Sequence, residues 1–455
     1  MLLEKSREEV PTLLKDGKIT ICVVGGGYVG LPSGVLLADL GANVIVCNRT
    51  KEKNDALNAG KAYIKEAHMD EMLEDVVRRK KLCATSDVEG AVAKSDVILI
   101  TVGTPLDKDG ILDDAQVRGA CVSVGKGLKK GSLVILRSTV NPGTTERAVL
   151  PILEKNSGMQ LGEFGLCDVP ERLQEGKAIE NLKTDSIVIG GYKFHQKSCE
   201  IAAGLFDILK VPIEIVSTPT ASELSKLVWN YLLDSSVANA QIIAQICEKI
   251  GADVMEIRKN ANLDPRIRMM IPGPGTGGPC MPKDVTALYN TAKNLGIEKN
   301  CLESLRLVRV INGVSMPQHA ISLVKECLDE KGIELKNAEI GVLGLTFKGG
   351  TDDLRESPAL KAVNEIKNVA KKVDIFDPYI KDGVVEGAGI KQNWKDAVAG
   401  KDLCIVLTDH KEFFGIRLDE MRKIMKGGCL VDTRHVFDAD EARKYFTYRG
   451  IGHGV

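Results

Sequence analysis

Short apolar runs alternate with longer amphipathic stretches along most of the chain. The run at 19–24 is followed by a glycine-rich turn, a small-residue helical pattern and a second apolar run at 42–50. Strands alternating with helices predict an α/β fold with a doubly wound parallel sheet. Further predicted strands cover residues 96–105, 132–143, 165–173 and 186–191, with helices at 112–130 and 144–156.

The middle of the chain has a purely helical pattern. Residues 219–250 contain no Pro or Gly after the start, and a second helix is predicted at about 300–330. Thr220 or Ser222 is the expected N-terminal cap of the first helix. Two long helices between α/β units predict a spacer and a dimer surface. Glu223, Lys226 and Asn230 share one helix face, which would ordinarily be solvated.

The last third repeats the strand, glycine loop and helix pattern. It begins at 338–366, and the following apolar runs predict a second open parallel sheet, at 371–380, 401–410 and 428–437. We therefore expect two Rossmann-like domains joined by a central helical domain. The expected domains are residues 1–210, 211–325 and 326–455.

Composition and charge narrow the choice of partners. The 455 residues include 61 basic and 62 acidic side chains, so neither nucleic acid nor an anionic membrane is expected as a partner. The N-terminal segment is charged and no apolar stretch reaches membrane-spanning length. The twelve cysteines are scattered without a CxxC pair. This predicts reduced thiols in a cytoplasmic protein and no metal site.

The turn after the first strand has the spacing of a dinucleotide site. Gly25, Gly27 and Gly30 form G-x-G-x-x-G between a strand and a helix, which suits a pyrophosphate at the helix N-terminus. The second strand ends in Asn48 and Arg49 where an NAD site usually has an acidic residue. Asn48 can bond a ribose hydroxyl. Arg49 is either a partner for a 2′-phosphate or a surface charge, so NAD is expected and NADP stays possible.

Two loops outside this turn carry candidate chemistry. Residues 273–284, GPGTGGPCMPKD, cannot form a regular helix or a central strand, and they place Cys280 in a glycine-rich turn. The cysteine is either an inert small residue or a nucleophile. The loop containing Lys348, Asp352 and Arg355 suits either a nucleotide diphosphate or an interdomain salt-bridge cluster. Glu171 and Glu175 follow a predicted strand end near the expected nicotinamide, or are simply helix-start carboxylates.

The chain resembles the UDP-glucose/GDP-mannose dehydrogenase family from about residue 17 to residue 440. Nine motifs in a fixed order carry the resemblance: GGGYVGLP, TVGTPLD, RSTVNPGTT, PERLQEGKA, SELSKLVWN, GPGTGGPCMPKD, GLTFKGGTDDLRESP, FDPY and DTRHVF. The resemblance implies a four-electron oxidation of the C6 alcohol of a nucleotide sugar. The aldehyde is captured by Cys280 as a thiohemiacetal, which is oxidised to a thioester and then hydrolysed.

The same resemblance implies roles for residues in all three expected domains, with the C-terminal domain binding the UDP-sugar. The implied catalytic residues are Cys280, Lys226, Asn230, Asp284, Glu171 and Thr139. The implied cofactor contacts are Gly25, Gly27, Tyr28, Val29, Gly30, Asn48, Arg49, Thr104, Thr139, Lys283 and Arg355. The implied substrate contacts are Glu171, Arg172, Leu173, Glu175, Lys226, Asn230, Gly277, Arg306, Phe347 and Lys348, with Arg309 as an alternative to Arg306.

Arg172 decides the expected sugar. It stands where UDP-glucose enzymes of the family typically have Phe, which favours UDP-N-acetylmannosamine, with UDP-glucose as the alternative. A two-electron β-hydroxyacid dehydrogenase is a rival enzyme class, and a nucleotide-sugar-binding regulator without chemistry is a rival outside enzymes. The predicted protein is a homodimer that makes a uronic acid donor for polysaccharide or glycan synthesis.

Overall fold

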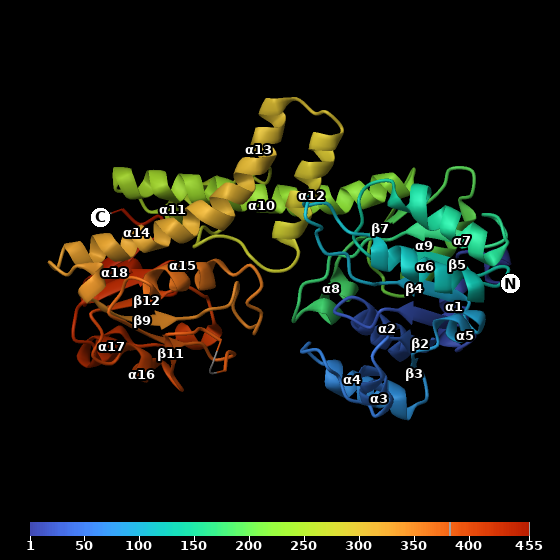
Figure 1. Ribbon diagram of the computed structural model, residues 1–455, viewed down its shortest axis with the longest axis horizontal. Coiled ribbons are helices and arrows are strands. Elements are labelled where there is room, and N and C mark those ends of the chain that lie inside the picture. The colour runs from blue at the N-terminus through green and yellow to red at the C-terminus, as the bar shows by residue number, and fades with distance from the viewer. Residues whose placement is uncertain (382–383, 455) are drawn as a thin grey trace. The chain divides into compact units, whose positions relative to one another are not determined.

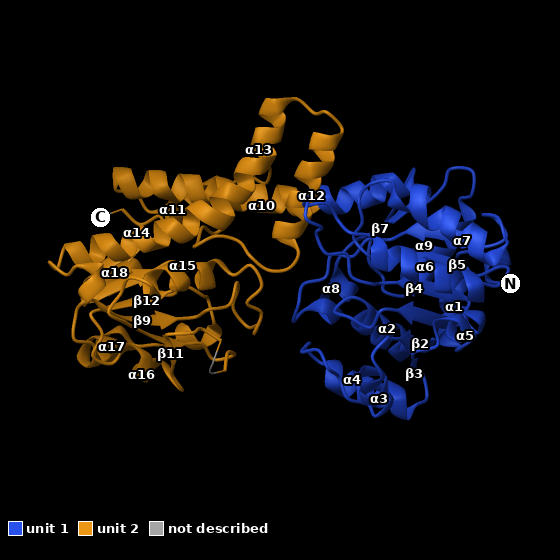
Figure 2. Cartoon of the chain, in the orientation of Figure 1, with its two compact units in different colours: residues 1–228 blue, residues 229–455 orange. Residues whose placement is uncertain are grey.

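The computed structural model describes residues 1–381 and 384–454 and divides the chain into two compact units. The first unit comprises residues 1–228 and the second residues 229–455 (Figure 2). The boundary between the two units lies inside the long central helix, residues 219–250, and the central helices after it belong to the same compact unit as the second sheet. The expected boundaries near 210 and 325 stay a prediction.

The first unit contains an eight-stranded sheet in the order β3-β2-β1-β4-β5-β6-β7-β8 (Figure 1). The first six positions have the strand order of a dinucleotide-binding fold, with the reversal of order between β1 and β4. The strands are β1 (Thr20–Val24), β2 (Asn43–Cys47), β3 (Leu82–Thr85), β4 (Val97–Ile100), β5 (Leu133–Leu136), β6 (Gly165–Asp168), β7 (Ile187–Gly190) and β8 (Ile213–Val216).

Helices cover both faces of this sheet and bury two separate cores. One core joins the sheet to α1, α2, α4, α8 and α9, and the other joins it to α5, α6 and α7. Strands β4, β5 and β6 are buried along their whole length, which explains their continuous apolar runs. The helices are α1 (Val10–Lys15), α2 (Gly30–Asp39), α3 (Lys51–Asn58), α4 (Met69–Arg78), α5 (Val88–Ala93), α6 (Ala115–Gly127), α7 (Leu150–Ser157), α8 (Ala178–Thr184) and α9 (Lys197–Asp207).

The expected parallel α/β architecture is confirmed, with one local exception. β7 pairs with β6 in the antiparallel direction through Asp168 and Gly190, and β8 is parallel to β7. The six strands predicted from apolar runs in this unit are all present. β3 and β8 were not predicted, because each has only four residues and at most one fully buried position.

Helix α10 (Pro219–Ile250) matches the predicted central helix residue for residue. The expected cap is wrong: the backbone N–H of Ala221 donates to Thr218 Oγ1, whereas the Ser222 hydroxyl donates to Asp168. The stripe expected to be solvated is instead buried. Glu223, Lys226 and Asn230 are 2%, 4% and 3% exposed.

The second unit has a six-stranded parallel sheet in the order β11-β10-β9-β12-β13-β14, again with one central reversal. Helices α14 and α15 cover one face, and α16 and α17 cover the other (Figure 1). Its strands are β9 (Glu339–Leu343), β10 (Lys372–Phe376), β11 (Gly389–Ile390), β12 (Leu403–Val406), β13 (Cys429–Asp432) and β14 (Thr447–Gly450).

The helix predicted at 300–330 is interrupted. α13 and α14 are joined by a π-helical turn at Ile311–Ser315, which contains the buried Asn312. The remaining helices of this unit are α11 (Val254–Ala261), α12 (Met281–Asn294), α13 (Lys299–Val310), α14 (Met316–Asp329), α15 (Pro358–Lys367), α16 (Trp394–Val398), α17 (Leu418–Ile424) and α18 (Ala439–Arg443). Within the described ranges, 1–381 and 384–454, the structure has no helix with the length and apolarity needed to cross a membrane.

Candidate functional site

The glycine turn after β1 lines a cleft of about 630 Å³ in the first unit. Gly25 has φ +108°, a conformation that favours glycine, and a Cβ on Gly30 would lie 2.0 Å from the Gly25 carbonyl oxygen. A Cβ on Gly27 would meet no atom within 4 Å. Gly25 and Gly30 are therefore required by the turn and by helix packing, whereas Gly27 leaves open space for a ligand.

Asn48 holds the glycine turn in place. Its side-chain oxygen accepts a hydrogen bond from the Gly26 backbone N–H at 3.0 Å, and its amide nitrogen donates to Asn54 Oδ1 at 3.1 Å. The hydroxyl of Tyr63 donates to the Gly26 carbonyl oxygen at 2.5 Å. Asn48 thus acts within the protein, and its predicted contact with a ribose hydroxyl stays a prediction.

The other predicted cofactor residues of this unit lie near the same strand ends. Arg49 lines the cleft and its guanidinium donates weakly to Gln116 Oε1 at 3.4 Å. The Thr104 hydroxyl donates to the Thr139 carbonyl oxygen at 2.6 Å, joining the loops after β4 and β5. Tyr28 is exposed, and Val29 is the N-cap residue of α2.

Lys226 and Glu171 form a buried ion pair within the first unit. Lys226 Nζ lies 3.8 Å from Glu171 Oε1, and the side chains are 4% and 8% exposed. The other oxygen of Glu171 accepts the Leu173 backbone N–H at 2.6 Å, so the loop itself orients the carboxylate. Arg172, in between, donates to Ser186 Oγ at 3.3 Å.

Further buried charges surround this pair. Arg137 is 3% exposed, and its guanidinium lies 5.3 Å from the centre of the Phe206 ring. Burial lowers the pKa of Arg137, and the carboxylates of Glu171 and Asp168 act in the opposite direction. Burial raises the pKa of Asp168 well above its ordinary value, and the neighbouring Glu223 adds to that rise.

Glu223 ties α10 to the loop after β5. Its carboxylate accepts the Gly143 N–H at 2.5 Å, the Thr145 N–H at 2.7 Å and the Thr145 hydroxyl at 2.6 Å. Burial nevertheless raises its pKa. The residue is therefore a structural anchor next to Lys226.

In the second unit, Cys280 is exposed at the end of a largely buried loop. It is the N-cap residue of α12, so its thiol lies at the end where backbone N–H groups of the helix favour a negative charge. A Cβ on Gly278 would lie 2.8 Å from the Phe347 ring, and one on Gly277 would lie 2.4 Å from the Glu356 carbonyl oxygen. The nearest protein atom to an added Gly277 Cβ is thus a backbone oxygen, and the predicted contact of Gly277 with substrate stays a prediction.

Asp234 fixes this loop to α10. Its fully buried carboxylate accepts the Thr276 hydroxyl at 2.6 Å, the Asn312 amide at 2.8 Å and the Arg309 guanidinium at 2.8 Å. The backbone carbonyl oxygen of Asn312 also accepts the Thr276 N–H at 3.1 Å. Arg309, considered above as a substrate contact, is here part of the loop anchor. Asp234 was missed, although it extends the Glu223, Lys226 and Asn230 stripe by one turn.

Asp284 and Asn230 form a second buried pair in this unit. The Asn230 amide donates to Asp284 Oδ2 at 2.5 Å, and Lys283 Nζ lies 3.1 Å from the other carboxylate oxygen. Asp284 is 1% exposed, and its backbone N–H donates to the Cys280 carbonyl oxygen at 2.8 Å. The first turn of α12 thus places a carboxylate, a cation and a thiol within five residues.

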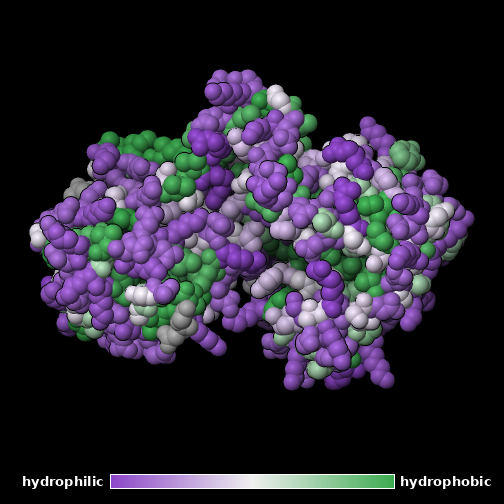
Figure 3. All heavy atoms as spheres, in the orientation of Figure 1, coloured by the Kyte–Doolittle hydropathy of each residue, from purple (hydrophilic) through white to green (hydrophobic). Residues whose placement is uncertain are grey.

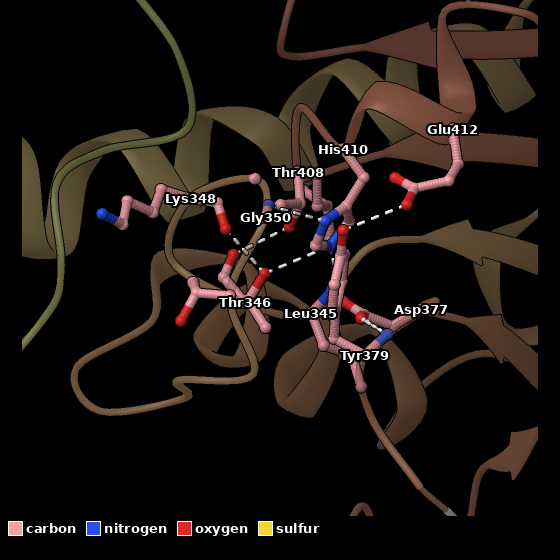
Figure 4. Close-up of polar contacts among 12 residues, drawn as sticks. Leu345, Thr346, Lys348, Gly350, Asp377, Tyr379, Thr408, His410 and Glu412 are labelled. Atoms are coloured by element: carbon pink, nitrogen blue, oxygen red, sulfur yellow. Dashed lines mark hydrogen bonds and ion pairs between the residues drawn. The ribbon is translucent and has the colours of Figure 1, made fainter. Parts of the chain in front are cut away.

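The Lys348 loop is organised by a buried histidine (Figure 4). His410 Nδ1 accepts the Gly350 N–H at 3.1 Å, so the ring hydrogen is on Nε2. Nε2 lies 3.0 Å from Asp377 Oδ2 and 3.2 Å from Thr346 Oγ1. The Lys348 carbonyl oxygen accepts the Thr346 hydroxyl, while its side chain points away from the cluster (Figure 4).

The remaining predicted residues of the second unit have clear partners. Arg355 forms a bidentate pair with Asp353, with Nε 3.0 Å from Oδ1 and Nη2 2.7 Å from Oδ2. This pair lies inside one loop, so the nucleotide-diphosphate and interdomain salt-bridge alternatives both stay predictions. Arg306 is exposed on α13 and pairs with Glu303 at 2.5 Å. Phe347 lies against Gly278 of the cysteine loop.

The predicted residues therefore fall into separate groups. The glycine cleft and the Lys226–Glu171 pair belong to the first unit. Cys280, Lys283, Asp284, Asn230 and the Lys348 loop belong to the second. The described residues contain no group of three or more His, Cys, Asp or Glu side chains arranged to hold a metal.

Comparison with known proteins identifies the family. Three models of the UDP-glucose/GDP-mannose dehydrogenase family match: the NAD binding domain at residues 19–210, the central domain at 220–312 and the UDP binding domain at 341–439. The chain belongs to the UDP-glucose/GDP-mannose dehydrogenase family.

Named relatives within this dehydrogenase family differ in their sugar. The chain is 34% identical to a UDP-N-acetyl-D-mannosamine dehydrogenase of Pyrococcus horikoshii, covering 95% of this chain and 99% of that protein. It is 33% identical to a UDP-glucose 6-dehydrogenase of Rhizobium meliloti, with the same coverages. The solved structure of the Pyrococcus horikoshii enzyme matches with a TM-score of 0.86 at 34% identity, over 96% of this chain and 99% of that one.

The family assigns NAD to the first unit, and the glycine cleft fits it. The open space at Gly27, the N-terminus of α2 and the polar residues at the end of β2 provide a cradle for a dinucleotide. This family of nucleotide-sugar dehydrogenases uses NAD as its oxidant, and the second α/β unit contains its UDP binding domain.

Two glycine substitutions separate packing from cofactor binding. Gly30→Ala should lower the free energy of unfolding by about 1–3 kcal/mol, because its Cβ would overlap the Gly25 carbonyl oxygen. Gly27→Ala should leave the Tm unchanged and weaken NAD binding, because its Cβ points into open space. Thermal melts and NAD titration of both variants check this. Equal loss of stability in the two would contradict it.

Proposed function

We propose that the protein is a nucleotide-sugar 6-dehydrogenase that oxidises the C6 alcohol of a UDP-sugar to a carboxylate, with UDP-N-acetylmannosamine as its preferred substrate. One observation carries the proposal: Cys280 is exposed at the N-terminus of α12, at the end of a loop whose glycines are buried. An inert packing cysteine has no need of exposure or of a helix N-terminus.

Each oxidation removes a hydride and a proton, and NAD supplies the hydride acceptor for both. In the first, a basic group takes the alcohol proton and an aldehyde forms. The Cys280 thiolate then adds to the aldehyde carbon to give a thiohemiacetal. The second oxidation gives a thioester, and water releases the carboxylate and the thiol.

The buried polar pairs support catalytic roles for their residues in these reaction steps. Glu171 and Asp284 are the proposed bases that position water or take protons, because each carboxylate is buried and held by a backbone or side-chain donor. Lys226 is the proposed donor to the developing oxyanion, with Asn230 as a second donor on the same face of α10. The Thr139 hydroxyl is proposed to lie beside the attacking water.

The substrate and assembly proposals rest on other features. Lys348 and Phe347 are proposed contacts of the nucleotide sugar, since the His410 cluster fixes their loop. A homodimer through α10 is supported by an exposed apolar row, in which Leu232, Ile246 and Ile250 are 57%, 49% and 72% exposed. Hydrophobic surface lies over this part of α10 in Figure 3.

Cysteine substitution tests the mechanism. Cys280→Ser should retain UDP-sugar binding but lose acid formation by several orders of magnitude, because an alkoxide does not replace a thiolate leaving group at neutral pH. Cys301→Ser, on another exposed cysteine of the same unit, is the matched control and should keep wild-type turnover.

Stoichiometry completes that test. The wild-type enzyme should reduce two NAD per sugar, and a yield of one would favour a two-electron hydroxyacid dehydrogenase. Normal acid formation by Cys280→Ala would refute the covalent mechanism.

The cofactor preference tests Arg49. Since Arg49 lines the cleft at the end of β2, we expect measurable use of NADP beside NAD. Arg49→Ala should lower the NADP/NAD ratio of kcat/KM, whereas Lys51→Ala, outside the residues that line the cleft, should not. An unchanged ratio in Arg49→Ala would make it a surface charge only.

Side-by-side kinetics test the sugar. An acetamido group brings an N–H and a C=O that a matched pocket must pair, so kcat/KM should favour UDP-N-acetylmannosamine over UDP-glucose by about 5- to 150-fold. UDP-N-acetylglucosamine is the third substrate, for comparison. A kcat/KM for UDP-glucose equal to or above that for the N-acetyl sugar would overturn the substrate and leave the role of Cys280 intact.

A further inference from the structure

A chain of hydrogen bonds links the C-terminal segment to the entry of the cysteine loop. His453 Nδ1 lies 3.1 Å from Asp253 Oδ2, and His453 Nε2 lies 3.0 Å from Nδ1 of His435. His435 Nε2 lies 3.2 Å from the carbonyl oxygen of Pro272, which directly precedes the loop that ends at Cys280. All these residues belong to the second unit, and none has a part in the proposed reaction.

The three hydrogen bonds made by the two rings need three hydrogens on ring nitrogens. A carboxylate and a carbonyl only accept hydrogen bonds, so His453 Nδ1 and His435 Nε2 must each carry a hydrogen. The bond between the rings needs a third hydrogen. Two neutral imidazoles have only two N–H groups, so the complete chain beside an ionised Asp253 contains one imidazolium.

The surroundings indicate which ring is charged. Burial lowers the pKa of His435 to about 4, and the neighbouring His453 adds to that effect, so His435 is the neutral ring. Other titratable or charged groups around the two rings are Asp432, Arg434, Tyr448, Asp438 and Asp440.

The position of His435 is specific and open to proton exchange. Its φ is +54°, in the left-handed region that few side chains adopt and in which His is enriched. This places the ring between His453 and Pro272. Both rings line a hollow of about 320 Å³, through which solvent can exchange protons with the ring nitrogens.

We propose that His435 and His453 are positioning residues that hold the entry of the Cys280 loop while they share one proton. When that proton leaves, one of the three bonds must break. His453 Nδ1 keeps its hydrogen bond to the Asp253 carboxylate. His435 exchanges its hydrogen with solvent from Nε2 to Nδ1, where it is donated to His453 Nε2, and the Pro272 carbonyl loses its donor. The loop then loses one anchor, and the nucleophile is held less firmly.

The kinetic test compares pH profiles. Between about pH 5 and pH 8, the wild-type kcat should show a step of about threefold to tenfold, falling as the pH rises and the pair of rings loses its shared proton. KM for the UDP-sugar should not follow that step. His453→Gln should remove the step. His195→Gln, the same change at a histidine of the first unit, should keep it. A His453→Gln profile identical to wild type would overturn the proposal.

A second measurement uses the wild-type protein and no turnover. The chain has six histidines, so their ring ¹⁵N resonances can be assigned individually by NMR. His435 should be the Nε2–H tautomer while the pair of rings holds its shared proton, and its tautomer should change in the same pH step. Independent titration of the two rings would refute the coupling. The inference rests on the proposed role of Cys280, but this readout fails or succeeds separately from Cys280→Ser.

Discussion

The buried carboxylate of Asp234 is the interaction on which the candidate nucleophile depends. A charge with no solvent exposure is tolerated only when it is paired and hydrogen-bonded, and Asp234 has Thr276, Asn312 and Arg309 as partners. Thr276 belongs to the cysteine loop, and Asn312 to the π-helical turn between α13 and α14. One carboxylate therefore holds a glycine-rich segment that has no regular structure of its own.

Helix α10 carries most of the polar groups that the proposed chemistry needs. Glu223, Lys226, Asn230 and Asp234 follow one another along its buried face, and their partners come from loops and helices distant in sequence. Burying four such groups on one helix costs free energy that only their partners offset. A helix with a purely structural role would gain little from burying these polar groups, whereas a helix that supplies catalytic side chains needs them.

The glycines show how one residue type serves different physical needs. Gly30 is required by the packing of α2 on Gly25, and Gly277 and Gly278 by the backbone of Glu356 and the ring of Phe347. Gly27 alone among these has open space around its missing Cβ. Motif spacing predicts where glycines gather, but the atoms opposite each one decide whether it serves a ligand or the fold.

The sequence by itself determined the two α/β units, the central helix α10 and the dinucleotide turn, and it placed Cys280 in a glycine-rich loop. These follow from local periodicity and from motifs a few residues long, whose physics is contained in neighbouring residues. The short strands β3 and β8, the reversed direction of β7 and the burial of the α10 stripe did not follow. Each depends on which distant segment packs against it. Tertiary structure alone decided that Asn48 holds the glycine turn and that Asp234 anchors the cysteine loop. It also decided that His435 meets Pro272, because a hydrogen-bond partner 163 residues away leaves no trace in local pattern.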